Sequence, residues 1–126
     1  MEEREGKTLP ENNVPIDVTF LLAQVGGSAE TAVLVLEEFI SQTPLDIENI
    51  EKNLGTGNLV DAGKVAHSMK GSSGVFGAQQ LRQIAADLEI ACRENDAEKA
   101  SDLFAQLKLE AKRCLDFVPE LKKCLS

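Results

Sequence analysis

The sequence predicts an all-α protein, an antiparallel up-down-up-down four-helix bundle with a short N-terminal lid helix. Apolar residues recur at steps of three and four along four long segments, which is the period of an amphipathic helix. Short connections rich in glycine or polar residues separate these segments, and such connections place neighbouring helices antiparallel. No segment shows the strict alternation of a half-buried strand.

The first residues differ in character from the rest of the chain. Residues 1–13 are polar, charged and aperiodic, which predicts a flexible tail before a domain that spans residues 14–126. Pro15 suits the first turn of a helix, so the lid helix is expected from there to about Val25. The pair of glycines that follows would end it.

The four long segments carry their own start and stop signals. Ser28 and Asn58 suit the capping positions of the first two long helices, and a Gly-Thr-Gly run ends the first. Pro119 predicts the start of a separate last turn. The positions expected to face the core on the second, third and fourth long helices are Leu59, Ala62, Ala66, Met69, Ser73, Phe76, Leu81, Ile84, Ala85, Leu88, Ala91, Cys92, Ala100, Leu103, Phe104, Leu107, Ala111, Cys114 and Val118.

Length and charge exclude several classes of function. A chain of 126 residues fits one domain with one core. A net charge of −8 disfavours binding to nucleic acid or to an anionic membrane, because both require clustered Lys and Arg. No apolar run approaches the length of about 18 residues that a membrane span needs, so we expect a cytoplasmic protein. A monomer is expected because the apolar stripes can all be buried internally.

The cysteines and the familiar motifs indicate no metal or cofactor in this chain. Cys92, Cys114 and Cys124 form an odd set without CxxC spacing, which favours reduced thiols over a disulfide framework or a zinc site. The segment 57–64 has the wrong spacing for a phosphate-binding P-loop, and no GxSxG hydrolase motif is present.

His67 is the only histidine, and small residues surround it. It lies one residue off the apolar seam, about 100° round the helix, so its imidazole should be exposed. Gly63 and Gly71 lie one turn to either side, and glycines in a helix need a reason such as close docking of a partner. Lys70, one turn away, could neutralise a phosphoryl group carried on the imidazole.

Glu89 is predicted to meet His67 across a helical hairpin. If the chain turns near Ala78, His67 and Glu89 each lie eleven residues from the turn, at the same height of roughly 16 Å. Glu89 would then accept a hydrogen bond from Nδ1–H of His67 and leave Nε2 as the exposed nucleophile. The alternative is a surface ion pair of Glu89 with Arg93 at i, i+4, and both contacts can hold together.

The segment from His67 to Ser73, HSMKGSS, resembles the His-x-x-Lys-Gly-Ser/Ala-Ser/Ala core of histidine-containing phosphotransfer (HPt) domains. The resemblance continues through Gly77-Ala78 and the following helix, and the helix order over residues 16–118 is similar. It implies a phosphocarrier without autonomous catalysis. In such proteins, Gln or Glu commonly stands at the offset of Glu89.

The resemblance also implies the partners. His67 would accept a phosphoryl group from the phospho-aspartate of one receiver domain, in a hybrid sensor kinase, and pass it to the receiver domain of a response regulator. The Mg²⁺ would be bound by the receiver and not by this chain. We expect Gly71 and Gly63 on the docking surface, with Lys64 and Arg93 as peripheral contacts to the acidic receiver site.

Two other functions are compatible with the sequence. One is a module that only docks receivers or kinases, with His67 carrying little phosphoryl flux. The other is the phosphoacceptor domain severed from a histidine kinase that phosphorylates it directly with ATP; such a kinase needs a nucleotide-binding domain, which this sequence lacks.

Overall fold

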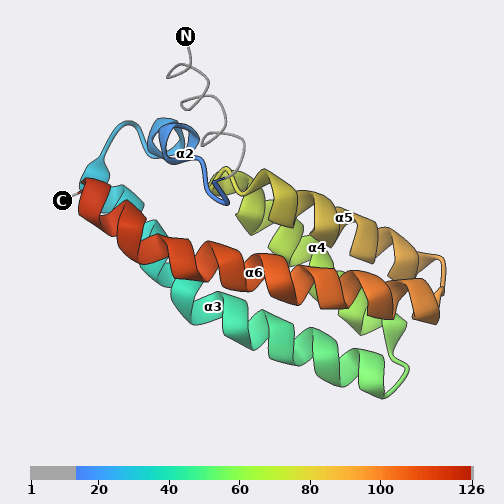
Figure 1. Cartoon of the computed structure of the whole chain (residues 1–126). Helices are drawn as coiled ribbons and strands as arrows, with labels where there is room; N and C mark the ends of the chain where they lie inside the picture. The colour runs from blue at the N-terminus through green and yellow to red at the C-terminus, as the bar shows by residue number, and fades with distance from the viewer. Residues whose placement is uncertain (1–13, 126) are drawn as a thin grey trace, which may run out of the picture.

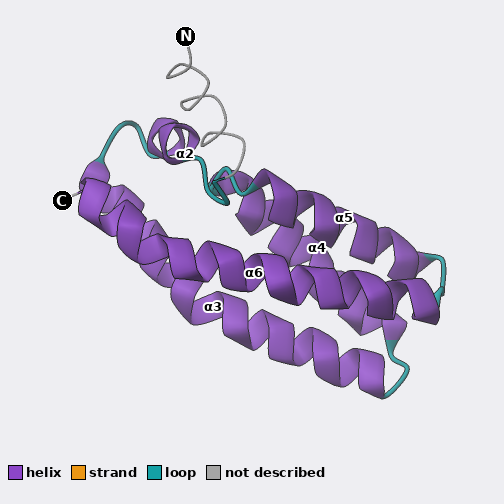
Figure 2. Ribbon diagram, in the orientation of Figure 1, coloured by secondary structure: helices purple, strands orange, loops and turns teal. Residues whose placement is uncertain are grey.

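The computed structural model describes residues 14–125 and has no strand in that range. Its helices are arranged as a bundle with a short helix across one end (Figures 1 and 2). They are α2 (Val18–Gln24), α3 (Ala29–Gly55), α4 (Leu59–Val75), α5 (Gln79–Arg93) and α6 (Ala97–Leu125).

The four long helices form a closed ring of contacts. Each packs on the next along the chain, and α6 returns to pack on α3. The connections 56–58, 76–78 and 94–96 are too short for anything but a reversal of direction. The predicted up-down-up-down bundle is therefore confirmed. The lid helix α2 contacts α3 and α4 at the end of the bundle that holds the α4–α5 turn (Figure 1).

Polar caps start most of the helices. Ser28 and Asn58 each accept a hydrogen bond from the backbone N–H three residues later, at 3.1 and 3.2 Å, as predicted. Asp96 does the same for α6 at 3.1 Å. Helix α5 has no side-chain cap, because its N-cap position is the fully buried Ala78. Burial against the bundle replaces the cap there.

The lid helix begins later than predicted. It starts at Val18 because the carboxylate of Asp17 caps it and accepts from the N–H of Phe20 at 3.1 Å. Pro15 and Ile16 lie before the helix, and the side chain of Ile16 is only 1% exposed. Burial of an apolar side chain of this size contributes about 1.5–3 kcal/mol, which favours a bend that enters the core over another helical turn.

The predicted stop at Pro119 is wrong, because α6 continues through it to Leu125. A proline inside a helix costs about 3 kcal/mol. Val118 and Leu121 on either side are 1% and 3% exposed, and their burial offsets that cost. The tertiary packing of the apolar face therefore overrides the local signal.

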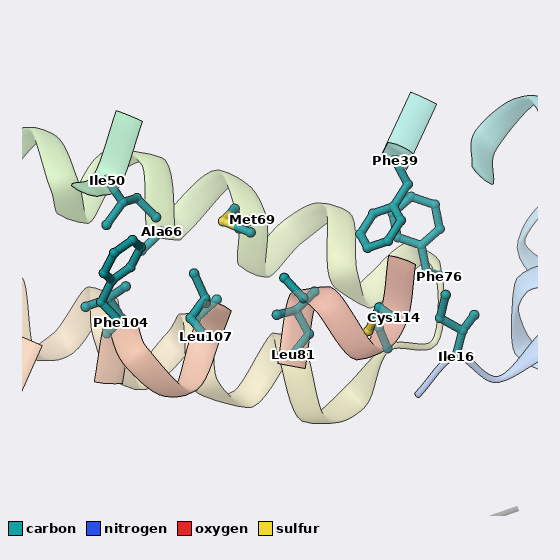
Figure 3. Close-up of a cluster of buried hydrophobic side chains, with 14 of the residues drawn as sticks. Ile16, Phe39, Ile50, Ala66, Met69, Phe76, Leu81, Phe104, Leu107 and Cys114 are labelled. Atoms are coloured by element: carbon teal, nitrogen blue, oxygen red, sulfur yellow. The ribbon is translucent and has the colours of Figure 1, made fainter. Parts of the chain in front are cut away.

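The core runs the length of the bundle between the helices (Figure 3). Near the lid, the rings of Phe39 and Phe76 pack with centroids 4.5 Å apart, and Ile16 lies beside them. The hydroxyl of Ser73 is buried on the α4 seam, as predicted, and has no hydrogen-bond partner in the described part of the chain. Other labelled core residues are Ile50, Ala66, Met69, Leu81, Phe104, Leu107 and Cys114.

The cysteines are free thiols. Desolvation raises the pKa of Cys114 to about 12 and raises that of Cys92, so both stay protonated at neutral pH.

Within residues 14–125 no single helix is both long and apolar enough to cross a membrane. Helices α2 and α3 meet these criteria only when taken together, as a pair bent by 107°. The predicted tail, residues 1–13, lies outside the described residues.

We predict that Gly77→Ala destabilises the bundle. Gly77 has φ +70°, and an added Cβ would lie 2.9 Å from the Cβ of Asp17. The left-handed backbone alone costs about 1–2 kcal/mol for a residue with a side chain, and the clash adds to it. Urea denaturation should show the loss. An unchanged free energy of unfolding would mean that the lid does not pack on this turn.

Candidate functional site

His67 projects from the middle of α4 into solvent. Its neighbours Ala66 and Met69 are buried in the seam, whereas 66% of the His67 side chain is exposed. The prediction of an exposed imidazole one position off the seam is confirmed. Such a position leaves the ring accessible to another protein without disturbing the core.

Glu89 on α5 faces His67 across the helical hairpin. Its Oε2 lies 2.9 Å from Nδ1 of His67, so the contact predicted from equal heights is present. The same Oε2 accepts from Nη2 of Arg93 at 3.1 Å, so the alternative i, i+4 pair is present too. The two contacts share one oxygen, which leaves the other oxygen of the carboxylate for a third partner.

That third partner is Lys70, and the sequence reasoning missed it. Nζ of Lys70 lies 2.9 Å from Oε1 of Glu89. A lysine and a glutamate on adjacent helices carry no fixed spacing in the sequence. The signal available was that Lys70 lies one turn from His67, on the side of α4 that faces α5.

The charges around Glu89 fix its ionisation and the tautomer of His67. The hydrogen bond from Lys70 is the main reason why the pKa of Glu89 lies below its ordinary value of 4.5, and His67 adds to it against the effect of desolvation. An ionised carboxylate only accepts hydrogen bonds. Nδ1 of His67 therefore carries a proton, and in this tautomer the free electron pair of the ring belongs to Nε2.

Gly71 leaves open space beside His67. An added Cβ would meet no atom within 4 Å, so the glycine has no packing reason within the described chain. Open space of this kind is compatible with close docking of a partner. The docking role itself stays a prediction.

Gly63 has a reason inside the molecule. A Cβ on it would lie 3.1 Å from the Cβ of Cys92 on α5, so the glycine lets the two helices approach closely. The sequence reasoning assigned Gly63 to partner docking and missed this packing role. Its docking role stays a prediction.

A cleft of about 240 Å³ adjoins the site between α4 and α5. The exposed Val60 lies on the same helix face as His67. An apolar residue that lies off the seam, such as Val60, was the sequence signal that could have indicated this cleft. Lys64 lies on that face too and pairs with Asp61 at 3.8 Å. The lining residues are Leu59, Val60, Gly63, Glu89, Cys92 and Arg93.

No three His, Cys, Asp or Glu side chains among residues 14–125 cluster closely enough to hold a metal ion. The site consists of a nucleophilic imidazole, a carboxylate that orients it and two cations. This set can carry a phosphoryl group on Nε2 and balance its charge.

Comparison with known proteins agrees with the geometry. A model of the Hpt domain matches residues 34–117. The phosphorelay intermediate protein rdeA of Dictyostelium discoideum is 24% identical over 123 residues, which cover 98% of this chain and 47% of that protein. The chain thus spans about half the length of this curated relative.

Two solved structures share the fold. Histidine-containing phosphotransfer protein B of Pseudomonas aeruginosa PAO1 is 20% identical, with a TM-score of 0.80 over 86% of this chain and 95% of that one. The HPT domain of a sensor hybrid histidine kinase from Shewanella is 18% identical, with a TM-score of 0.78 over 89% and 97%. Because the family model covers most of the chain, including His67 and Glu89, this protein belongs to the Hpt domain family.

Proposed function

We propose that this chain is a phosphorelay intermediate that accepts a phosphoryl group on His67 and passes it on. The observation that carries the proposal is the contact of Nδ1 with Glu89, which leaves Nε2 free on an exposed ring. Membership of the Hpt family and the similarity to a protein named as a phosphorelay intermediate support it.

The transfer needs no group from this chain beyond the site described. The Nε2 electron pair attacks phosphorus, the P–O bond to the donor aspartate breaks, and its electrons return to that carboxylate. The proton stays on Nδ1, so the ring becomes positively charged as the P–N bond forms. The ionised Glu89 stabilises this charge across 2.9 Å. The return reaction on the next receiver reverses these steps.

Lys70 supplies positive charge to the phosphoryl oxygens in this proposal. Its side chain is one third exposed and its Nζ lies on Glu89, beside the imidazole. A long, flexible lysine can turn from a carboxylate to a phosphoryl group without moving the helix.

The partner would be a receiver domain that carries a phospho-aspartate and binds the Mg²⁺ itself. Phosphoryl transfer depends mainly on positioning and charge stabilisation, so the metal can come from the partner. The low surface at Gly71 would admit the receiver, with Gly63 beside it and Lys64 and Arg93 at the rim. The chain would then act as a cytoplasmic, monomeric phosphocarrier and not as an enzyme.

His67→Gln should abolish phosphoryl acceptance. Incubation with a ³²P-labelled phospho-receiver should label the wild type and leave the variant at background, because glutamine offers no comparable nucleophile. The label should be acid-labile, as expected for phosphohistidine. Equal labelling of both proteins would exclude His67. Labelling that occurs only with ATP and a kinase domain would instead favour the severed kinase fragment.

Gly71→Gln should make the folded protein more stable and phosphoryl transfer slower. Replacing an exposed helical glycine raises the free energy of unfolding by about 0.5–1 kcal/mol, because no atom lies within 4 Å of the new Cβ. The added bulk should slow transfer from a phospho-receiver by about tenfold, which corresponds to about 1.4 kcal/mol of lost binding or positioning energy. Gly71→Ala is the control with less bulk. Unchanged transfer in the glutamine variant would place the docking surface elsewhere.

Glu89→Gln should reveal the anionic carboxylate through the pH dependence of stability. The pKa of Glu89 in the folded protein is below 4.5, so the native state binds fewer protons than the unfolded state in that window. Its stabilisation is complete above pH 4.5 and is lost as pH falls through the folded-state pKa. Urea titrations should show that the free energy of unfolding differs between wild type and variant at neutral pH, and that this difference becomes smaller in acid. A difference independent of pH would contradict an ionised Glu89.

A further inference from the structure

Two cations from two different helices hold the one carboxylate that orients His67. Lys70 comes from α4 and binds Oε1 of Glu89, whereas Arg93 comes from α5 and binds Oε2. Oε2 is also the oxygen on Nδ1 of His67. The Glu89 side chain is only 14% exposed, so its charge is poorly solvated and needs a cation nearby.

The two cations differ in what they can do when a phosphoryl group arrives. Lys70 lies on the oxygen that the imidazole does not use, so it can leave without breaking the contact of Glu89 with Nδ1. A phosphoryl group on Nε2 brings about two negative charges, which compete with Glu89 for that ammonium. Once Lys70 turns away, Arg93 is the one lysine or arginine in the described structure that stays on the carboxylate, beside the positively charged ring of the phosphorylated His67.

Arg93 is well placed to remain. It lies four residues after Glu89 on the same helix, so their contact is local and independent of motion between helices. A guanidinium keeps its charge at any relevant pH. We propose that Arg93 is a positioning residue that keeps Glu89 ionised and on Nδ1 of His67 while Lys70 moves to the phosphoryl group.

This inference rests on the proposed function and changes the part given to Arg93. Arg93 acts inside the site, through Glu89, and not only as a contact to the receiver. In the free protein both cations contact Glu89, one on each oxygen. In the phosphorylated protein Lys70 is engaged elsewhere, and Arg93 keeps its contact.

The test uses the full chain with ¹⁵N-labelled histidine, and its ring nitrogens are observed by NMR at neutral pH. In the free protein, Arg93→Gln and Lys70→Gln should each keep the Nδ1–H tautomer, whereas the double variant should populate both tautomers. After phosphorylation with phosphoramidate, the Nδ1 proton of His67 should exchange with water on the order of tenfold faster in the single variant Arg93→Gln than in wild type. Arg93→Lys should restore slow exchange.

Lys112→Gln is the matched control, because it breaks an exposed i, i+4 ion pair with Asp116 on α6. It should behave as wild type in both states. The proposal would be overturned if the Nδ1 proton of phosphorylated Arg93→Gln exchanged as slowly as in wild type. It would also be overturned if the free double variant kept the Nδ1–H tautomer. If phosphoramidate does not modify wild-type His67, the proposed function fails. The tautomer of the free double variant then decides the role of Arg93 by itself.

Discussion

The close packing of α4 on α5 brings His67 within hydrogen-bond distance of Glu89. The buried faces of both helices carry small residues, and among them Ala62, Ala66, Ala85 and Ala91 are at most 1% exposed. Gly63 lies at the contact between the two helices, because even a methyl group there would lie 3.1 Å from Cys92. A wider separation of the helices would leave Glu89 out of reach, and the imidazole would have no fixed tautomer.

The turn between the two helices sets the height at which these residues meet. Residues 76–78 connect α4 to α5, and Gly77 adopts φ +70°, which residues with side chains rarely do. The lid helix secures this turn, because Asp17 N–H donates to the carbonyl of Gly77 at 3.2 Å. The lid is thereby tied to the turn of the hairpin that carries the site.

The sequence allowed the bundle and the His67–Glu89 pair to be predicted because both follow from regular helical geometry. Because the rise per residue is constant, two residues that are equally far in sequence from the turn lie at the same height on the two helices, whatever the core contains. The ends of α2 and α6 were not predictable in this way, since burial of Ile16, Val118 and Leu121 overrides the local proline signals. Tertiary contacts of this kind leave no local pattern.

The contact of Lys70 with Glu89 was unpredictable for a different reason. Its position on α4 was evident, but a lysine side chain has many rotamers, and only the fold decides which acceptor is within reach. The sequence reasoning directed Lys70 to the phosphoryl group, while the structure places it on the carboxylate. In the proposed mechanism, these two contacts belong to the same side chain before and after the phosphoryl charge arrives.

The surface position of this polar cluster matters for a group that must be given away again. His67 and Arg93 are each 66% exposed, so water screens the charge of Arg93 and its ion pair with Glu89 is weak. A buried site would hold a phosphoryl group more tightly, and that group would then leave slowly. Moderate, shared contacts to Glu89 orient the ring while keeping both directions of transfer accessible, which is the requirement for a carrier as opposed to an end acceptor.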